Sequence, residues 1–522
     1  GTDTDTATSW TVPDGPGGAP SSCAPAGAMT RRRLIPHQVT IASQRRPSPL
    51  DQPRAPGWSG ALTDTMSDVE HDIVRTPGPL PRPGGLTAVA ERNLRVRRRH
   101  VFFVAGYDAM SAEGHDRIFR RELARFGTVW GARTACLDAA PVPTPTGALW
   151  RARAEGPGWQ TQPTFELLAW DDIARADMAR PLRSHLAGSV RALADMIASG
   201  TIAAYFRTSR RYGLFFLFTY ALLLTFWIVA AAVGFATGRA LAPLAGPWLA
   251  VGAGALVALG AGALLLRWPG RRFRLRQSLD LAEFSVDFAR GRHRAVDARI
   301  AAFAERVRAL EAAAPAEGID EIIVAGHSLG AMHAVSTVAA ALDADPTFGT
   351  RTRVRILTLG STTAKFALHP AGSRLRAAAE RVAGEARIGW MEIQSRDDIV
   401  SFYKVNPVTL APATFAEPLV VAGDFSLRPL LRHVEIREML TPAAYRRFYF
   451  DVMRLHCQCF LANEVRARHD FYAHICGPLA FDVTAAHSNG LRAYLDPDGT
   501  LRPLVTDADG RILPLEESAR PQ

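Results

Sequence analysis

The sequence predicts an α/β fold, in which a mainly parallel sheet carries helices on both faces and is interrupted by a two-helix transmembrane hairpin. Three observations lead to this prediction. Beyond residue 320, short apolar runs alternate with helix-like segments, which is the pattern of a parallel sheet. Residues 212–266 hold two long runs with almost no charge. A Gly-x-Ser-x-Gly motif at residues 326–330 joins an apolar run to a helix-like segment.

The first 98 residues differ in composition from the rest of the chain. They are rich in Pro, Gly, Ser, Thr and Arg, and they show no sustained apolar period of 2 or 3.6. Such a segment buries too little apolar area to offset its ordering entropy, so we predict a disordered tail over residues 1–98. It contains no long apolar run, so we do not expect a signal peptide.

The ordered domain is expected in two parts, residues 99–205 and 275–522. The first part predicts a buried strand, a helix, a second strand and a second helix. In chain order these are residues 101–105, the stretch through Ile118, Leu123 and Phe126, residues 165–169 and residues 177–200. In the second part, apolar residues at mostly helical spacing over 281–310 predict a long amphipathic packing helix.

Two adjacent runs are long and apolar enough to cross a bilayer. No charged residue occurs from Tyr212 to Gly238 or from Ala240 to Leu266, and each run exceeds the roughly 20 residues that a spanning helix needs. Two buried core helices are the alternative, but two neighbours of this length are rare in soluble domains. We therefore predict a transmembrane hairpin over 212–266, with spans at 212–236 and 243–266. Small residues in the second run favour close packing of the spans, namely Gly252, Gly254, Gly260 and Gly262.

Arginines around these runs predict the orientation of the hairpin. Three precede the first span and five follow the second, whereas the connecting loop carries Arg239 alone. Positive charge stays on the cytoplasmic side of a membrane, so both ends of the hairpin, and with them the rest of the chain, are expected in the cytoplasm. The flanking residues are Arg207, Arg210, Arg211, Arg267, Arg271, Arg272, Arg274 and Arg276.

The overall composition bears on two further classes of function. The chain has 522 residues and a formal charge of +11, but only two of its basic residues are lysines, Lys365 and Lys404. It has no basic module with interleaved aromatic residues and no zinc-finger spacing, so we do not expect nucleic-acid binding. The five cysteines are too scattered for a disulfide framework. We expect free thiols in a reducing compartment.

The Gly-x-Ser-x-Gly motif is where the sequence predicts chemistry. A strand-like run, residues 321–325, leads directly into Gly326-His327-Ser328-Leu329-Gly330, and a helix-like run follows. A turn that exposes a serine between a strand and a helix forces strained torsions and close contacts, which glycines permit. The helix N-terminus adds a positive dipole end near a developing oxyanion. Ser328 is the predicted nucleophile, and His327 is expected to support the turn.

This motif resembles the nucleophile elbow of lipases and esterases of the α/β-hydrolase fold, class 3 lipases included. Residues 101–107 resemble the strand whose following loop supplies an oxyanion-hole amide, which here implies Gly106 or Tyr107. Residues 354–361 resemble the strand after the nucleophile helix, and residues 390–400 resemble the strand and loop that carry the acid. The resemblance therefore implies an α/β-hydrolase domain that is interrupted by the hairpin.

The acid is expected to follow Ser328 in the chain and to precede the histidine, because the family's order is Ser, acid, His. Asp397 and Asp398 are the two candidates. In the lipase pattern the acid stands just before a short apolar pair, here Ile399-Val400, which favours Asp398. The other aspartate is then expected to be a solvated loop charge or a helix cap.

Several histidines after the acid could serve as the base. His456-x-Gln458, followed by Cys476-Gly477-Pro478, resembles membrane-anchored bacterial hydrolases of this type, which favours His456. His469 and His433 are the main alternatives. A histidine in a helical run, as His456 is expected to be, packs more often than it catalyses. The histidines in the required order are His433, His456, His469, His474 and His487.

Together these residues predict hydrolysis through an acyl-enzyme. Ser328 would attack an ester or thioester carbonyl while His456 takes its proton and Asp398 orients the imidazole. The backbone N–H groups of Leu329 and Tyr107 would bind the oxyanion. No metal or organic cofactor is required.

The expected protein is a membrane-anchored serine hydrolase of the bacterial inner membrane, with its hydrolase domain in the cytoplasm. Its expected partners are the membrane and an ester or lipid substrate. Two alternatives stay open. One is a catalytically silent hydrolase-like module held at the membrane, which gains weight if no histidine reaches Ser328 within hydrogen-bond distance. The other is an acyltransferase or thioesterase that uses the same residues.

Overall fold

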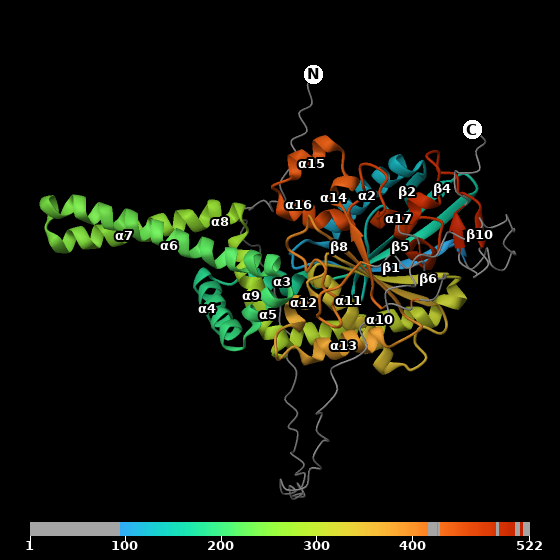
Figure 1. Cartoon of the computed structure of the whole chain (residues 1–522), viewed down its shortest axis with the longest axis horizontal. Helices are drawn as coiled ribbons and strands as arrows, with labels where there is room; N and C mark the ends of the chain where they lie inside the picture. Colours follow the sequence, from blue (N-terminus) through green and yellow to red (C-terminus); the bar gives the residue numbers. More distant parts are fainter. Residues whose placement is uncertain (1–93, 416–424, 426–427, 487–489, 507–511, 515–522) are drawn as a thin grey trace, which may run out of the picture. The chain divides into compact units, whose positions relative to one another are not determined.

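The computed structural model describes residues 94–415, 425, 428–486, 490–506 and 512–514. Within them the chain forms a mixed α/β structure around a nine-stranded sheet of order β2-β4-β5-β1-β6-β7-β8-β9, with β3 paired to β4 (Figure 1). The strands from β5 to β9 in this order run parallel, and β2, β3 and β4 join antiparallel to one side. The prediction of a mainly parallel sheet is therefore confirmed.

The strands of the sheet and of a separate small hairpin have the following bounds. They are β1 Arg98–Val104, β2 Arg133–Cys136, β3 Val142–Thr144, β4 Gly147–Gly156, β5 Trp159–Leu168, β6 Glu321–His327, β7 Arg353–Leu359, β8 Gly389–Ser395, β9 Leu430–Val434, and the paired β10 Leu504–Thr506 and β11 Ile512–Pro514.

The helices of the described residues lie between these strands and after them. They are α2 Ala112–Trp130, α3 Asp171–Met178, α4 Leu182–Ala198, α5 Thr201–Thr208, α6 Arg210–Ala245, α7 Pro247–Arg267, α8 Pro269–Arg272, α9 Leu275–Ala289, α10 Arg294–Glu317, α11 Leu329–Ala344, α12 Thr363–Ala367, α13 Ser373–Ala383, α14 Ile436–Met439, α15 Pro442–Phe448, α16 Val452–Cys457, α17 Phe471–Cys476 and α18 Phe481–Ala486, with 3₁₀ turns at Gln458–Phe460 and Gly490–Ala493.

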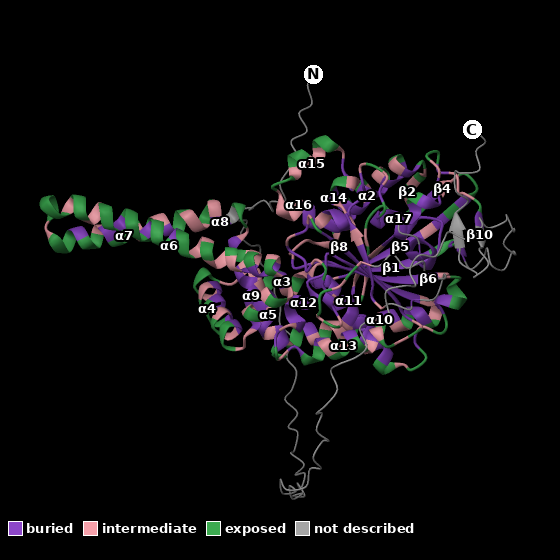
Figure 2. Ribbon diagram, in the orientation of Figure 1, coloured by how far each residue is buried: buried purple, intermediate pink, exposed green. Residues whose placement is uncertain are grey.

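Helices cover both faces of the sheet, and β1 shows how the sequence arranges this. Successive side chains of a strand point to opposite faces. Val101 and Phe103 belong to one apolar cluster with Phe126 of α2, whereas Phe102 and Val104 belong to a second cluster with side chains of α9, α10 and α11. All four β1 side chains are buried, as is most of the sheet in Figure 2. A strand buried on both faces is typically a near-continuous apolar run, as residues 101–104 are here.

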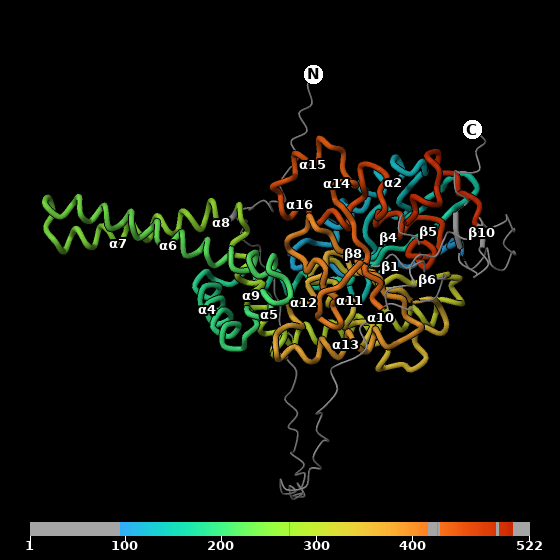
Figure 3. Tube along the Cα trace, viewed as in Figure 1, coloured from blue at the N-terminus to red at the C-terminus, as the bar shows by residue number. Residues whose placement is uncertain are grey.

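The ordered chain begins earlier than the sequence predicts. Most of the predicted tail, residues 1–93, lies outside the described residues, but Leu94 and Val96 are buried. The N–H of Val96 donates to the carbonyl oxygen of Pro478 (2.9 Å), and Ala480 donates back to Leu94 (2.8 Å). Figure 3 shows this C-terminal part of the chain, in red, beside the blue and teal strands. Local composition does not reveal a partner so far along the chain.

Three other elements differ from the prediction. The expected helix over 177–200 ends at Met178 and restarts at Leu182, because Pro181 starts a new helix. The long helix expected over 281–310 is two helices, α9 and α10, separated at Gly291, whose φ is 68°. The antiparallel strands β2 to β4 were not predicted, although β4 alternates apolar and charged side chains from Trp150 to Glu155, the pattern of a half-buried strand.

The two apolar runs form two long helices that pack against each other. A Cβ on Gly234 of α6 would lie 2.5 Å from the carbonyl oxygen of Gly254 of α7, so the two backbones meet directly. The chain turns at Gly246, so the predicted span boundaries of 236 and 243 are both inside α6. Both helices are long and apolar enough to cross a membrane, and only 17% of the most apolar window of each is buried.

The first half of α6 belongs to the α/β domain. Tyr212 stacks on Phe402 with ring centroids 3.9 Å apart, and Phe216 is buried against Tyr205 of α5. By contrast, α7 has 21 residues, which gives a length of about 31 Å and so matches the hydrocarbon thickness of a bilayer. Tyr212, where the predicted span begins, thus packs on the domain, ahead of the part of α6 that pairs with α7.

Cysteine cross-linking tests the register of this helix pair. The Ala230→Cys/Gly262→Cys protein is expected to form a disulfide under mild oxidation, because a Cβ on Gly262 would lie 3.7 Å from that of Ala230, within the range of disulfide geometry. Ala230→Cys/Gly260→Cys is the control, since a Cβ on Gly260 has no neighbour within 4 Å. Non-reducing electrophoresis after cleavage between the helices reads the outcome. Equal cross-linking of both pairs would contradict the register.

Candidate active site

Ser328 lies at a sharp turn between β6 and α11. Its backbone has φ 57° and ψ −119°, a conformation that non-glycine residues rarely adopt and that costs about 1–3 kcal/mol. Backbone hydrogen bonds hold the strained residue: its N–H donates to Leu359 at the end of β7 (2.9 Å), and its carbonyl accepts from the N–H groups of Ala331 (3.2 Å) and Thr362 (3.3 Å). Ser328 is half-buried, whereas both of its neighbours are buried.

The two glycines of the motif permit backbone contacts that no side chain would allow. A Cβ on Gly326 would lie 2.4 Å from the carbonyl oxygen of Gly330, across the turn. A Cβ on Gly330 would lie 2.1 Å from the carbonyl oxygen of Val104 and 2.5 Å from that of Ala105, at the end of β1. The motif therefore fits together the ends of β6, β1 and the start of α11.

The loop after β1 reaches the serine. A Cβ on Gly106 would lie 3.2 Å from the Cβ of Ser328, and the N–H of Asp108 donates back to the carbonyl of Gly106 (2.9 Å) in a tight turn. The first N–H groups of an α-helix have no acceptor within the helix, and Leu329 is the first residue of α11. Leu329 and Tyr107, the two predicted oxyanion donors, thus flank Ser328 from two separate elements.

A residue that the sequence analysis missed secures this loop. Gln277 of α9 donates from Nε2 to the carbonyl oxygen of Tyr107 (2.7 Å), and its Oε1 accepts from Arg274 (3.3 Å). The tyrosine hydroxyl also donates to Asp177 (3.4 Å). Gln277 lies 170 positions from Tyr107 and belongs to no motif, so no sequence signal pointed to it.

Asp398 and His456 are joined by a short hydrogen bond. His456 Nδ1 lies 2.8 Å from Asp398 Oδ2, and the other oxygen of Asp398 accepts the backbone N–H groups of Val400 (2.9 Å) and Ser401 (3.3 Å). Burial acts to raise the pKa of Asp398, but the charge of His456 and these hydrogen bonds outweigh it and hold the pKa below its ordinary value. The carboxylate is therefore ionised at neutral pH, so Nδ1 is the donor of the bond.

The second nitrogen of His456 is left with a free lone pair. Nε2 is buried and has no hydrogen-bond partner among the described residues. A Cβ on Gly360 would lie 3.2 Å from His456 Cε1 and 2.9 Å from Asp398 Oδ2, and Gly360 directly follows Leu359, which binds the N–H of Ser328. The ring therefore lies close to the elbow, although no hydrogen bond between Ser328 Oγ and His456 occurs in the described part of the chain.

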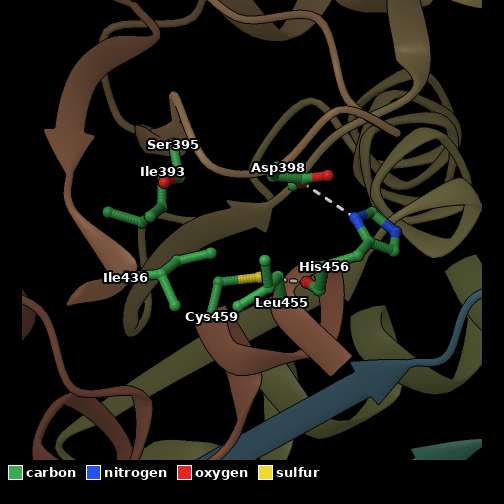
Figure 4. A pocket seen from close by; sticks show the side chains of 8 residues that line it. Ile393, Ser395, Asp398, Ile436, Leu455, His456 and Cys459 are labelled. Carbon is green, nitrogen blue, oxygen red and sulfur yellow. Dashed lines mark hydrogen bonds and ion pairs between the residues drawn. The ribbon is translucent and has the colours of Figure 1, made fainter. Parts of the chain in front are cut away.

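Figure 4 shows the ring of His456, on α16, turned toward Asp398. Asp398 and His456 border a narrow crevice, which apolar side chains and the thiol of Cys459 also line. This thiol donates to the carbonyl of His456 (3.3 Å). The residues lining it are Gly360, Ile393, Ser395, Asp398, Ile436, Leu455, His456 and Cys459.

His327 holds the histidine segment in place. Its Nε2 donates to the backbone carbonyl of His456 (3.1 Å), and the two rings lie 4.5 Å apart. Burial, together with repulsion from the charge of His456, lowers the pKa of His327 to about 3. A neutral imidazole locked onto a carbonyl suits the supporting role that the sequence predicts.

The other candidates for acid and base lie elsewhere. Asp397 accepts the N–H of Ile436, the first residue of α14 (3.1 Å), which is closer to a helix cap than to a solvated loop charge, the two roles that we expected for the second aspartate. His433 lies beside Tyr403 and near Glu435. His469 Nε2 donates to the carbonyl of Cys459 (2.7 Å). His474 lies near Thr484 (3.1 Å). His487 falls outside the described residues.

Comparison of the chain with protein-family models, with curated proteins and with solved structures gives no match. The fold and the site therefore define its class by themselves. It is a mixed α/β protein with a mainly parallel sheet, a strained serine at a strand-to-helix turn and a buried aspartate–histidine pair beside it.

Substitution of Gly360 tests how tightly the pair is held. Gly360→Ala is expected to lower stability by more than the about 1 kcal/mol that a positive φ costs an alanine, because the new methyl group would contact Asp398 and His456. The matched control is Gly158→Ala, since Gly158 has φ 75° with no neighbour within 4 Å. Thermal unfolding of the two variants gives the comparison. Equal losses of stability in the two variants would show that Asp398 and His456 move aside for the methyl group without further cost.

Proposed function

We propose that this chain is a membrane-anchored serine hydrolase of the α/β-hydrolase fold that cleaves a carboxylic ester through an acyl-enzyme. The observation that carries the proposal is the bond between Asp398 and His456, close to a serine whose backbone is strained. Strain of this kind is typical of a nucleophile elbow. A buried aspartate that fixes one tautomer of a histidine is the arrangement by which such a histidine becomes a base.

The topology supports the assignment to this fold. Ser328 follows β6, the loop of Gly106 follows β1, Asp398 follows β8 and His456 comes after β9. These four strands run parallel in one sheet, so their carboxyl ends lie at the same edge. The chain order Ser, Asp, His is that of α/β-hydrolases.

The reaction follows from the roles of the groups. Nε2 of His456 accepts the Ser328 proton as Oγ attacks the ester carbonyl, and the resulting imidazolium then gives that proton to the leaving alkoxide. Asp398 stabilises the imidazolium through Nδ1. The N–H groups of Leu329 and Tyr107 bind the negative oxygen of each tetrahedral intermediate. Water, activated by the same nitrogen, releases the acid, so no metal or organic cofactor enters the reaction.

A silent hydrolase-like module is the second candidate, and one observation favours it. In the described part of the chain, Ser328 Oγ and His456 Nε2 are not joined by a hydrogen bond. Catalytic hydrogen bonds are often long in a free enzyme and shorten when substrate binds, so this spacing is compatible with activity. An ester substrate, including a lipid acyl ester, remains our proposal because the domain adjoins two apolar helices.

The location that we propose is the bacterial inner membrane, with α6 and α7 as the spanning pair and the α/β domain in the cytoplasm. Large apolar side chains are exposed along both helices, among them Ile228 (60%) and Leu256 (72%). Their exposure favours lipid contact over a role as core helices. Arg267 is the last residue of α7, Arg210 is the first residue of α6 and Arg207 stands just before it, which supports the cytoplasmic side.

Removal of the nucleophile tests the proposed activity. Ser328→Ala is expected to reduce kcat for p-nitrophenyl ester hydrolysis by about 10⁶, as nucleophile loss does in a catalytic triad. Its melting temperature should stay near that of the wild type, because a half-buried hydroxyl is the only group lost. A fluorophosphonate probe should label the wild type and not the variant. An unlabelled wild type, or full turnover by the variant, would favour the silent module.

The two aspartates give a matched pair of variants. Asp398→Asn is expected to lower kcat by about 10⁴, because an amide leaves His456 in the wrong tautomer. Asp397→Asn should leave kcat within a few-fold of the wild type, since Asp397 binds only the N–H of Ile436 among the described backbone groups. Steady-state kinetics with one ester substrate decides between them. A larger loss of kcat in Asp397→Asn than in Asp398→Asn would show that Asp397, and not Asp398, is the acid.

A reporter fusion tests the orientation. Alkaline phosphatase, which is active only in the periplasm, should stay inactive when fused after the last residue of the chain, because the arginines that flank α6 and α7 lie on the domain side. The same reporter fused in the turn at Gly246 should be active. Strong activity of the C-terminal fusion would reverse the proposed orientation.

A further inference from the structure

Helix α4 presents an apolar face to solvent although it belongs to a folded domain. One side of the helix is buried against α9, through residues that include His185, Gly188 and Met196. The opposite side holds the exposed Val190 (64%) and Ile197 (63%). The residues on this side recur every three or four positions, and they are Arg183, Ala187, Val190, Arg191, Ala194, Ile197 and Ala198.

The charge of this face has one sign. Its charged residues are Arg183 and Arg191, and Arg191 reaches sideways to Glu283 of α9 (3.1 Å) while its side chain stays 77% exposed. The acidic residue of α4, Asp195, lies off the face and is bound to Arg290 and His369. An apolar face with basic residues is complementary to a bilayer surface that contains anionic lipids.

Contacts place α4 at the level where α7 ends. Leu186 of α4 packs in one cluster with Phe226 of α6 and with Leu265 and Leu266, the last turn of α7. Tyr220 of α6 lies within 3.5 Å of the carbonyl oxygen of Ser189. The fit of α7 to the hydrocarbon thickness puts the edge of the bilayer at this turn. Trp268 directly follows α7 and is 80% exposed. Tryptophan side chains commonly anchor spanning helices at the membrane–water interface.

We propose that α4 is an interfacial helix, whose exposed face of Val190, Ile197 and the small residues between them lies in the headgroup region of an anionic bilayer. This is the bilayer that α6 and α7 are proposed to cross, so the inference rests on the proposed membrane insertion. Interfacial helices of this type bury their apolar face about 5–10 Å into the headgroup boundary. In Figure 2 the outer side of α4 is exposed, as are long stretches of α6 and α7.

This contact would set the distance between the catalytic site and the lipid. Helix α4 is tied to α9 by the bond of His185 to Asp280 and by the close packing of Gly188 on Glu283. Helix α9 in turn carries Gln277, which holds the carbonyl of Tyr107. A surface helix, a packing helix and the oxyanion loop thus form one chain of contacts from the headgroup region to Ser328.

Depth-dependent quenching tests the proposal on the full-length chain. Val190→Cys and Ile197→Cys would each be labelled with NBD and reconstituted into phosphatidylcholine/phosphatidylglycerol vesicles. Both sites are exposed, so labelling should not disturb the fold. Leu256→Cys, in the middle of α7, reports insertion, and Leu137→Cys, 47% exposed after β2, is the surface control. Labelled wild type corrects for the chain's own thiols.

We expect blue-shifted NBD emission at 190 and 197, and stronger quenching by lipids brominated near the headgroup than by lipids brominated deep in the chain. Leu256→Cys should show the reverse order, and Leu137→Cys should keep water-like, unquenched emission. Quenching at 256 without quenching at 190 and 197 would overturn the interfacial helix alone. A blue shift at 190 without quenching would mean that protein, another segment or a second copy, covers the face. No quenching at 256 would overturn the membrane insertion as well.

Discussion

The site depends on how closely the backbone at the end of β1 approaches the turn between β6 and α11. A Cβ on Gly330 would lie 2.1 Å from the carbonyl oxygen of Val104, so any side chain there would push the start of α11 away from the end of β1. The contact holds Gly106 against Ser328 and sets Leu329 at the first turn of its helix. Ser328 can keep its strained torsions because the bonds to Leu359 and Thr362 secure it from β7.

Local patterns predicted the parts of the fold that local sequence determines. Strands buried on both faces, such as β1 and β6, are continuous apolar runs, so their positions were close to those observed. Asp398 was favoured by the apolar pair that follows it and His456 by the resemblance of its His-x-Gln segment to hydrolases of this type, and the structure places the two side chains 2.8 Å apart. Their catalytic role stays a prediction.

Features set by distant contacts could not be predicted. Strands β2 and β3 have only four and three residues, so their pairing with β4, which itself pairs with β5, provides their stability. Val96 is ordered by a bond to Pro478, and Gln277 gains its role only because α9 packs beside the loop of Tyr107. Hydropathy likewise marked where α6 becomes apolar, but only the stacking of Tyr212 on Phe402 reveals that its first turns belong to the domain.

The stacking of Tyr212 on Phe402 also bears on why the hairpin interrupts the domain at this point of the chain. Phe402 lies four residues after Asp398, so the first turn of α6 packs on the loop that carries the acid. After the hairpin, α9 returns to the domain and its Gln277 binds the carbonyl of Tyr107, the proposed oxyanion donor. The two ends of the hairpin therefore contact two different parts of the site. A tilt of α6 and α7 would therefore be transmitted to both loops.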